Sequence, residues 1–241
     1  MSWNEHSGIS QSGISLYRFC PYAYFLKYKK KCEPMFWDTS AMDTGGYVHT
    51  SVDKFYKFHY DADENRDYIL VNSYAELKKV WDTSLDVTEF QKAYQCLETH
   101  ANWEYKNITD GLRTKPLTEI ELCHKGYYGF IDYFHLQNHK PIDWKTGKRA
   151  YLSYDYRMQA YVYKILLEAE FGIPINHFYF FFLYPNEWRT VSFGTDKQIK
   201  IGEDVERYKM LILDEEFEKK PRLENNCKNC PYKYYCRVLG V

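Results

Sequence analysis

No segment of this chain is apolar for long enough to cross a membrane. The longest apolar run lies between His177 and Tyr184, whereas a membrane helix needs roughly 20 consecutive apolar residues. The segment 1–22 also lacks the charged start and apolar core of a secretory signal. We therefore expect a cytoplasmic protein without a membrane partner. In a reducing compartment, the 7 cysteines are expected to be metal ligands or free thiols, not disulfides.

The chain also lacks a strong charge of either sign, with a formal net charge of -1. Any contact with nucleic acid must therefore be local. One N-terminal segment offers cations for phosphates beside aromatic rings that stack on bases. Its cations are Arg18, Lys27, Lys29, Lys30 and Lys31, and its rings are Tyr22, Tyr24, Phe25 and Tyr28. The same pattern is typical of a solvated amphipathic helix, and the sequence leaves both interpretations open.

No internal repeat or low-complexity tract is present, and 241 residues, 45% of them hydrophobic, can bury one sizeable core. We expect a single domain over residues 1–241 with a polar helical insertion over residues 61–115. Apolar periodicity and capping residues predict the helices. They are Ser15–Tyr28, a helix from Asp43 or Thr44 through Tyr56, stretches around Tyr74–Trp81 and Phe90–Tyr105 in the insertion, Ser153–Glu170 and Asp196–Lys219.

From Leu117 the pattern changes to alternating apolar and polar residues, which predicts strands. The first three form a meander over Leu117–Glu121, Tyr128–Phe134 and Pro141–Trp144, with turns at Lys125-Gly126 and Asn138-His139. The apolar run His177–Tyr184 and its hairpin partner Arg189–Phe193 add two more. Strands, a crossover helix and further strands predict an α/β protein with a mixed sheet flanked by helices.

Two acids and a lysine lie on two neighbouring strands of this meander. Asp132 lies on the middle strand, and Asp143 and Lys145 lie two residues apart on the next, hence on one strand face. Hydrolysis of a phosphodiester uses a divalent cation to neutralise charge and acidify water, and carboxylates suit Mg²⁺ or Mn²⁺. The Lys145 ammonium can then orient the water or stabilise the transition state. Taken alone, Asp143-x-Lys145 is also typical of a surface salt bridge at a strand end.

Four motifs occur in the order typical of the RecB-like branch of the PD-(D/E)XK nucleases. They are Gly45-Gly46-Tyr47-Val48-His49, Gly129-x-x-Asp132, Asp143-x-Lys145 and Gln159-x-x-x-Tyr163. The chain therefore resembles this branch, which implies a restriction-endonuclease-like core and a catalytic lysine beside a metal ion. The implied metal ligands are His49, Asp132, Asp143 and the Trp144 main-chain carbonyl; Lys145, Asp143 and Asp132 are the implied catalytic residues, and Gln159 and Tyr163 position the substrate.

Two details of the resemblance concern the acids. Asp143 stands where many relatives carry Glu. A further upstream acid, found in parts of the family, matches either Glu119 or Glu121, because the alternating pattern puts both on one face of the first meander strand. The sequence does not decide between them.

Four of the cysteines form a second candidate site. Cys227-x-x-Cys230 is followed by Cys236, and a proline follows both Cys20 and Cys230, as it does at iron-sulfur ligands. This spacing resembles AddB-type nucleases and CRISPR-associated RecB-like exonucleases, which implies a structural 4Fe-4S cluster joining the N- and C-terminal segments. Zinc is the main alternative, although zinc ribbons usually bring two close Cys-x-x-Cys pairs, and free thiols are the third. The others, Cys32, Cys96 and Cys123, are then expected to be small buried side chains.

The resemblance implies a Mg²⁺- or Mn²⁺-dependent DNA nuclease, specifically a single-strand-preferring exonuclease with endonuclease activity as a second expectation. It also implies a role in CRISPR adaptation, recombination or viral DNA processing. No phosphate-binding glycine-lysine loop is present, so the chain supplies no helicase motor of its own. A helicase or an integrase is the expected protein partner. A catalytically inactive iron-sulfur DNA-binding module is the alternative, but the intact motif residues argue against decay. A redox protein would leave those motifs unexplained.

Overall fold

The computed structural model describes residues 8–35, 39–219, 227–228 and 230–238. Its strands are β1 (Ile9–Ser10), β2 (Leu117–His124), β3 (Tyr127–His135), β4 (Lys140–Lys145), β5 (His177–Phe182) and β6 (Glu187–Ser192). Its helices are α1 (Gln11–Phe19), α2 (Pro21–Tyr24), the π-helical turn η1 (Phe25–Lys29), α3 (Ser40–Phe58), α4 (Arg66–Val80), α5 (Val87–Thr109), α6 (Tyr154–Phe171), α7 (Asp196–Leu213) and α9 (Lys233–Val238). None of the helices in these ranges is both long and apolar enough to span a membrane.

The strands form one mixed sheet of six strands in the order β1-β3-β4-β5-β6, with β2 on the other edge of β3. β2, β3 and β4 are antiparallel neighbours, as the meander predicts. Helix α6 is the crossover that makes β4 and β5 parallel. The expected mixed α/β fold with flanking helices is confirmed.

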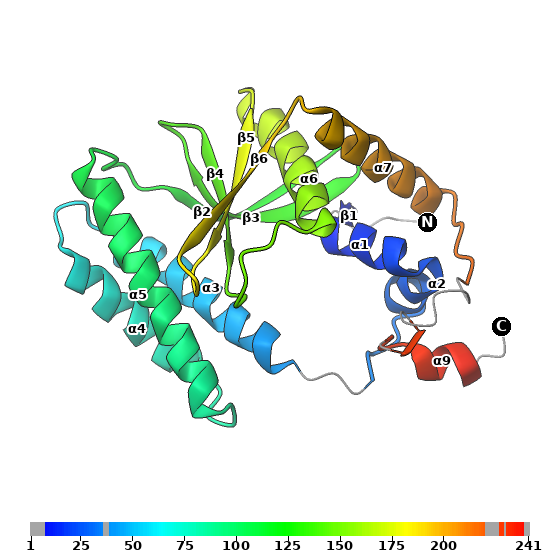
Figure 1. The fold of residues 1–241 in the computed structure, drawn as a ribbon, viewed down its shortest axis with the longest axis horizontal. Helices are drawn as coiled ribbons and strands as arrows, with labels where there is room; N and C mark the ends of the chain where they lie inside the picture. The colour runs from blue at the N-terminus through cyan, green and yellow to red at the C-terminus, as the bar shows by residue number, and fades with distance from the viewer. Residues whose placement is uncertain (1–7, 36–38, 220–226, 229, 239–241) are drawn as a thin grey trace.

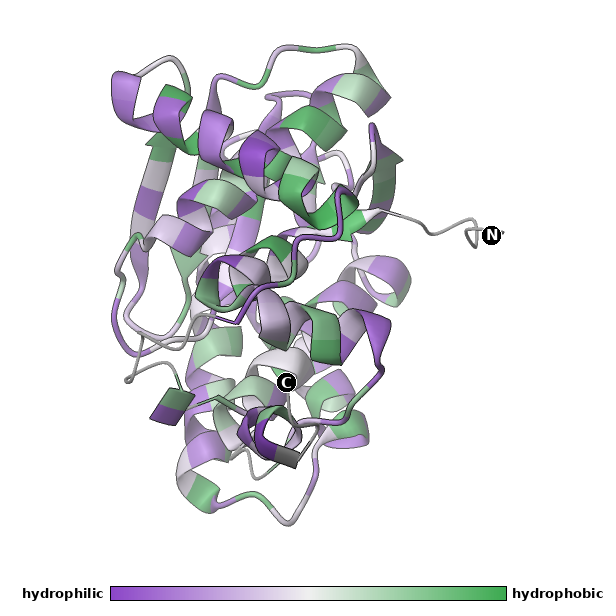
Figure 2. Cartoon of the chain, turned by 90° about the vertical axis from the view of Figure 1, so that its right-hand side faces the viewer, coloured by the Kyte–Doolittle hydropathy of each residue, from purple (hydrophilic) through white to green (hydrophobic). Residues whose placement is uncertain are grey.

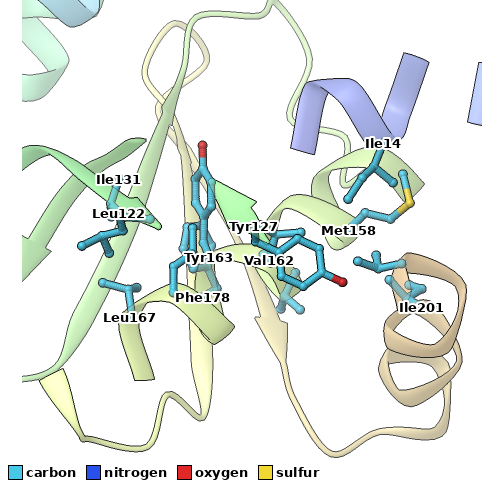
Figure 3. Close-up of a cluster of buried hydrophobic side chains, with 14 of the residues drawn as sticks. Ile14, Leu122, Tyr127, Ile131, Met158, Val162, Tyr163, Leu167, Phe178 and Ile201 are labelled. Carbon is cyan, nitrogen blue, oxygen red and sulfur yellow. The ribbon is translucent and has the colours of Figure 1, made fainter. Parts of the chain in front are cut away.

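Helices cover both faces of the sheet and enclose two hydrophobic cores (Figure 1). The first core lies between the sheet and helices α1, α6 and α7, where Met158 and Val162 of α6 meet Ile201 of α7 (Figure 3). The second lies between the sheet and helices α3, α4 and α5. Strand β5 is buried from both sides, with Phe180 in the first core and Phe181 in the second. This two-sided burial explains why its sequence is continuously apolar.

Capping side chains fix where several helices begin. Asn65, Asp86, Ser153 and Thr195 each accept a backbone N–H from the first turn of α4, α5, α6 and α7 respectively. Gly172 ends α6 in the left-handed conformation, at φ 65°. Polar residues share each helix with apolar ones (Figure 2), as expected for helices that cover a sheet.

The predicted helix Ser15–Tyr28 is wrong, because Cys20 breaks it in an extended conformation, at φ -161°. Proline is disfavoured inside a helix but suits a first turn, so α2 begins at Pro21. Tyr22 and Tyr24 are both buried, so these two rings are not available to stack on bases. Some of the cations are also engaged: Arg18 pairs with Asp155 and Lys29 with Glu215.

Other boundaries also differ from the expectation. Helix α3 begins at Ser40, before Asp43, and α7 ends at Leu213, before Lys219. The predicted helical insertion holds α4 and α5, both longer than expected, and the short strand β1 was not predicted. The expectation of buried spare cysteines is right only for Cys96; Cys32 is partly exposed and Cys123 is exposed.

A buried polar network ties α5 to α3 within the second core. The Tyr56 hydroxyl of α3 donates to Glu104 Oε2 at 2.8 Å and lies 2.9 Å from His100 Nε2. Burial lowers the pKa of His100 to about 3, so its imidazole is neutral. Because the Tyr56 hydroxyl gives its one proton to Glu104, His100 Nε2 donates to that hydroxyl. Burial raises the pKa of Glu104 to about 7. The His100 ring packs edge-to-face on Trp144 at 5.5 Å, so the network lies directly behind β4.

Substitution Glu104→Gln should change the pH dependence of stability. Between the ordinary pKa of 4.5 and the native value of about 7, the unfolded chain loses this proton while the native state keeps it. Wild-type stability should therefore fall as pH rises through that window. The neutral amide removes this contribution, so the variant should gain up to about 3 kcal/mol relative to wild type.

Urea unfolding of both proteins at several pH values measures this difference. Glu98→Gln is the matched control, because Glu98 lies on the same helix but its side chain is 46% exposed. Parallel pH profiles for wild type and Glu104→Gln would contradict the expectation.

Candidate active site

The candidate site lies where β3 and β4 separate. Their ladder runs only from the His135–Lys140 pair to the Tyr133–Ile142 pair. Because β2 occupies the other edge of β3, β1 and β4 share this edge, and β1 pairs only with Tyr127 and Tyr128. Among the strands described, none pairs with the stretch of this edge in between. We call this opening the strand fork.

A carboxylate bridges the strand fork in place of a backbone pair. Asp132 Oδ2 accepts a hydrogen bond from the Trp144 backbone N–H at 2.8 Å. The same oxygen lies 3.4 Å from His49 Nδ1 of α3. His49 Nε2 lies 3.1 Å from the Trp144 carbonyl oxygen, and since a carbonyl only accepts, this nitrogen donates. The predicted ligands His49, Asp132 and Trp144 are therefore brought together.

Glu119 joins this group and Glu121 does not. His49 Nδ1 lies 4.0 Å from Glu119 Oε1, and ligand atoms of His49, Glu119 and Asp132 all lie within 4.8 Å of one another. Glu121 is exposed on the sheet. The structure thus favours Glu119 as the upstream acid that the sequence left open.

The expectation that the two glutamates share a strand face is wrong because the backbone turns at Glu119. Glu119 has a φ of +45°, in the left-handed region that few side chains adopt. Leu117 and Ile120 consequently pack against the same core, although regular alternation would put them on opposite faces. The left-handed residue shifts the phase of β2 and directs its own carboxylate to the site.

The remaining predicted residues form a second group on the α6 side of β4. Lys145 Nζ lies 2.5 Å from Asp143 Oδ1 and donates to Gln159 Oε1 at 3.1 Å. Gln159 Nε2 donates to Asp143 Oδ2 at 2.5 Å. The three side chains close a ring that fixes the amide orientation and the lysine. Tyr163 is buried one turn further along α6.

Gly129 explains how α6 approaches the sheet. A Cβ atom at this position would come within 2.8 Å of the Tyr163 ring, so a larger residue would push the helix away. The glycine of the Gly129-x-x-Asp132 motif therefore sets the distance between β3 and the helix that carries Gln159.

The charges in the site shift each other's pKa values. Burial lowers the pKa of His49, but the Asp132 carboxylate outweighs it and raises that pKa to about 9. Burial opposes ionisation of Asp132, yet His49 and Lys145 hold its pKa below the ordinary value. Burial and the Asp132 charge raise the pKa of Asp143 to about 6 and that of Glu119 to about 7. Asp143 and Glu119 thus resist ionisation, although nearby cations oppose both shifts.

This donor set fits a divalent metal ion. Burial and like charge disfavour ionised carboxylates, and a cation reverses both effects. Asp143 Oδ1 is buried and has no well-aligned hydrogen bond, despite the nearby Lys145 ammonium. Carboxylates and a main-chain carbonyl are the ligands that Mg²⁺ or Mn²⁺ prefers, and His49 adds one imidazole.

An open cleft of about 840 Å³ gives access to this group. Its walls come from α3, β2, β3, the loop after β4 and the start of α6; the polar side chains among them are His49, Thr50, Asp53, Lys57, Glu119, Asp132, Lys145, Thr146 and Tyr156. A Cβ atom at Gly45 would lie 3.1 Å from Thr146 Oγ1, and nothing lies within 4 Å of one at Gly46. The paired glycines therefore let α3 approach the loop and keep the cleft open.

Sequence reasoning missed three residues of the cleft. Asp53 lies one turn after His49 on α3 and could have been found from that spacing. Tyr156 precedes Gln159 by three residues, and Lys145 Nζ lies 4.6 Å from its ring centre. Phe130 lies in the Gly129-x-x-Asp132 motif, but nothing in the pattern marked it as exposed.

Carboxylates and an imidazole that could bind a metal ion, with an ammonium group beside them, are the groups that a metal-assisted phosphodiester hydrolase uses. The chain belongs to the PD-(D/E)XK nuclease superfamily, whose family model matches residues 8–237. Membership implies a metal-dependent nuclease acting on DNA, with the restriction-endonuclease-like fold described above.

Other comparisons add little to this assignment. A solved structure described as the crystal structure of SSO0001 is similar over 80% of this chain and 95% of that chain, at 15% identity and a TM-score of 0.36. A likeness this weak carries no argument. None of the curated proteins matches the sequence.

Glu119→Gln should weaken Mn²⁺ binding by roughly 10- to 100-fold, the scale for losing a group that supports a metal site. The carboxylate lies beside His49 and Asp132, whereas an amide brings no negative charge. Calorimetric titration with Mn²⁺ measures the effect, and His49→Ala and Asp132→Ala should weaken binding in the same way.

Glu121→Gln is the matched control, on the same strand but outside the cleft. Equal Mn²⁺ affinities for Glu119→Gln and Glu121→Gln would show that Glu119 is no ligand.

Proposed function

We propose that the protein is a single-strand-preferring DNA exonuclease, with some endonuclease activity, that uses Mg²⁺ or Mn²⁺. The observation that carries the metal-dependent chemistry is the convergence of His49, Glu119 and Asp132 at the strand fork, next to the Asp143, Lys145 and Gln159 ring. Single-strand preference and exonuclease action rest on the resemblance to the RecB-like branch. On that resemblance we also propose CRISPR adaptation, recombination or viral DNA processing as the pathway, with a helicase or integrase as partner.

In this proposal His49, Glu119, Asp132, Asp143 and the Trp144 carbonyl would hold the metal ion, which supplies charge neutralisation and a more acidic water. The arrangement supports two separate tasks. The α3 side of the fork supplies His49, Glu119 and Asp132, whose ligand atoms lie within 4.8 Å of one another. The α6 side holds Lys145. The site binds and orients the scissile phosphate between them.

Lys145 is the proposed catalytic cation. Burial lowers the pKa of Lys145, but Asp143 and Asp132 outweigh it and raise that pKa, so the ammonium stays protonated. Its Nζ atom contacts Asp143 and Gln159, which leaves it little rotational freedom. A cation fixed before the reaction stabilises charge that develops on the phosphate oxygens without reorganisation cost.

Lys145→Ala should reduce cleavage by about two to four orders of magnitude, the usual scale for a positioned acid-base or charge-stabilising group. Binding of Mn²⁺ and of single-stranded DNA should stay within a few-fold of wild type, since other cations contact the phosphates. Single-turnover cleavage and DNA affinity are measured on one preparation.

Lys78→Ala is the control, because Glu76-x-Lys78 repeats the acid-x-lysine pattern on helix α4, away from the fork. If wild type cuts no DNA with either metal, the inactive DNA-binding module becomes the better proposal. If Lys145→Ala cuts as fast as wild type, the lysine assignment fails.

We further propose that Cys20, Cys227, Cys230 and Cys236 hold a 4Fe-4S cluster. All four line one pocket of about 190 Å³, together with Phe19, Tyr22, Ala23 and Leu26. Burial raises the pKa of Cys230, and so do the three neighbouring cysteines. The break at Cys20 between α1 and α2 turns that thiol toward the C-terminal segment, which lies beside α2 (Figure 1).

The spacing of the motif supports a cluster more than zinc. Zinc ribbons usually bring two close Cys-x-x-Cys pairs, whereas Cys20 lies far from Cys227 and Cys230 in the sequence.

Cys20→Ala should abolish the brown colour and the broad absorbance near about 400 nm of anaerobically purified protein, and should lower its melting temperature, because it removes a bond joining the two ends. Cys123→Ala is the control, since Cys123 is exposed on β2. Iron analysis and thermal melting test this, and stoichiometric zinc without iron in the wild type would rule out the cluster.

A further inference from the structure

One aromatic ring in the cleft has no part in the chemistry above. Phe130 lies on β3 and lines the cleft with His49, Asp132 and Lys145. It is 42% exposed, whereas its neighbours Gly129 and Ile131 are buried. A phenyl ring left this open gains free energy when a ligand covers it.

Position on the β-strand places this ring beside the candidate metal ligand Asp132. Phe130 and Asp132 share a face of β3, opposite Ile131 in the first core. Two residues on one strand face lie about 7 Å apart, which is the scale of one nucleotide. A nucleobase stacked on Phe130 would therefore belong to the same DNA strand as a phosphate bound at Asp132.

The surroundings of Phe130 hold the ring without covering it. The Tyr128 ring meets it edge-to-face, with centroids 5.4 Å apart. Its partner on β2 is the exposed Glu121, which offers no apolar cover. The contact with Tyr128 therefore helps to hold the ring while its surface stays open to the cleft.

We propose that Phe130 stacks on a nucleobase of the bound strand and so makes the site select single-stranded DNA. A base inside a duplex has both faces covered by its neighbours, so an unpaired or unstacked base offers a face to the ring far more readily. This inference rests on the proposed nuclease function and names the residue that sets its strand preference.

Two cations beside the cleft could contact phosphates of the same DNA strand. The loop after β4, whose Thr146 and Gly147 line the cleft, continues into the exposed residues Lys148 and Arg149. Neither makes a salt bridge within the ranges that the structure covers, unlike Arg18 and Lys29 of the N-terminal segment, although the Lys148 charge acts on Asp86 before α5. Phosphates of the strand can pair with these cations while its base contacts Phe130.

Phe130→Ala should lower kcat/KM on single-stranded DNA roughly 10- to 100-fold, the scale of one lost base–aromatic stack. Phe130→Trp should restore most of the activity. Phe58→Ala is the matched control, because Phe58 is 71% exposed but does not line the cleft. The melting temperature of Phe130→Ala should stay close to wild type, since an exposed ring adds little to the core.

A set of substrates, each with one abasic nucleotide at a different position, tests stacking directly. A purely structural role of Phe130 would not make cleavage depend on that position. Wild type should lose activity at one position, and Phe130→Ala should show no further loss there. In chelator, 2-aminopurine at that position should be quenched by wild type and not by Phe130→Ala, which tests stacking without cleavage.

The outcomes separate the two proposals. If wild type cuts DNA but tolerates the abasic nucleotide everywhere and Phe130→Ala matches it, the stacking inference is wrong and the nuclease proposal stands. If wild type cuts no DNA, the nuclease proposal fails, and equal 2-aminopurine quenching by both proteins would overturn the stacking inference as well.

Discussion

The candidate active site depends on one hydrogen bond in which a side chain replaces a backbone partner. Where β3 and β4 separate, the Trp144 N–H has lost its partner strand and donates to Asp132 instead. An unpaired buried N–H would cost roughly 1–3 kcal/mol, so the carboxylate stabilises a fork that would otherwise close or strain. The same oxygen lies beside His49, and the carboxylate thereby links α3 to the fork and sets the distance between the helix and the sheet.

The two sides of the fork stabilise different charges. On the α3 side, His49 offsets Asp132, while burial and the Asp132 charge keep Glu119 difficult to ionise although His49 lies nearby. On the α6 side, Lys145 offsets Asp143 and Gln159 contacts both. Because each side is anchored to a different core, the separation between metal ligands and lysine is set by the packing of the whole sheet.

Much of the site could be predicted because its residues occur in short motifs with fixed spacing. His49, Asp132, Asp143 and Lys145 each occupy the element that the pattern indicated. The meander makes the strands of Asp132 and Asp143 neighbours, and α3 brings His49 to Asp132. The choice between Glu119 and Glu121 could not be predicted, since alternation assumes a regular strand and the left-handed φ of one residue breaks it. Burial of Tyr22 was equally hidden, because its partner Tyr232 is remote in sequence.

The cysteine pocket has a consequence for how the chain is made. Its N-terminal wall, with Tyr22, Ala23 and Leu26, leaves the ribosome long before the segment with Tyr232 that packs against it. During vectorial synthesis those apolar side chains stay uncovered after the sheet has formed, which is the period when a nascent chain is most prone to aggregate or to recruit a chaperone. The two cores beside the sheet can therefore assemble before Tyr232 covers this wall.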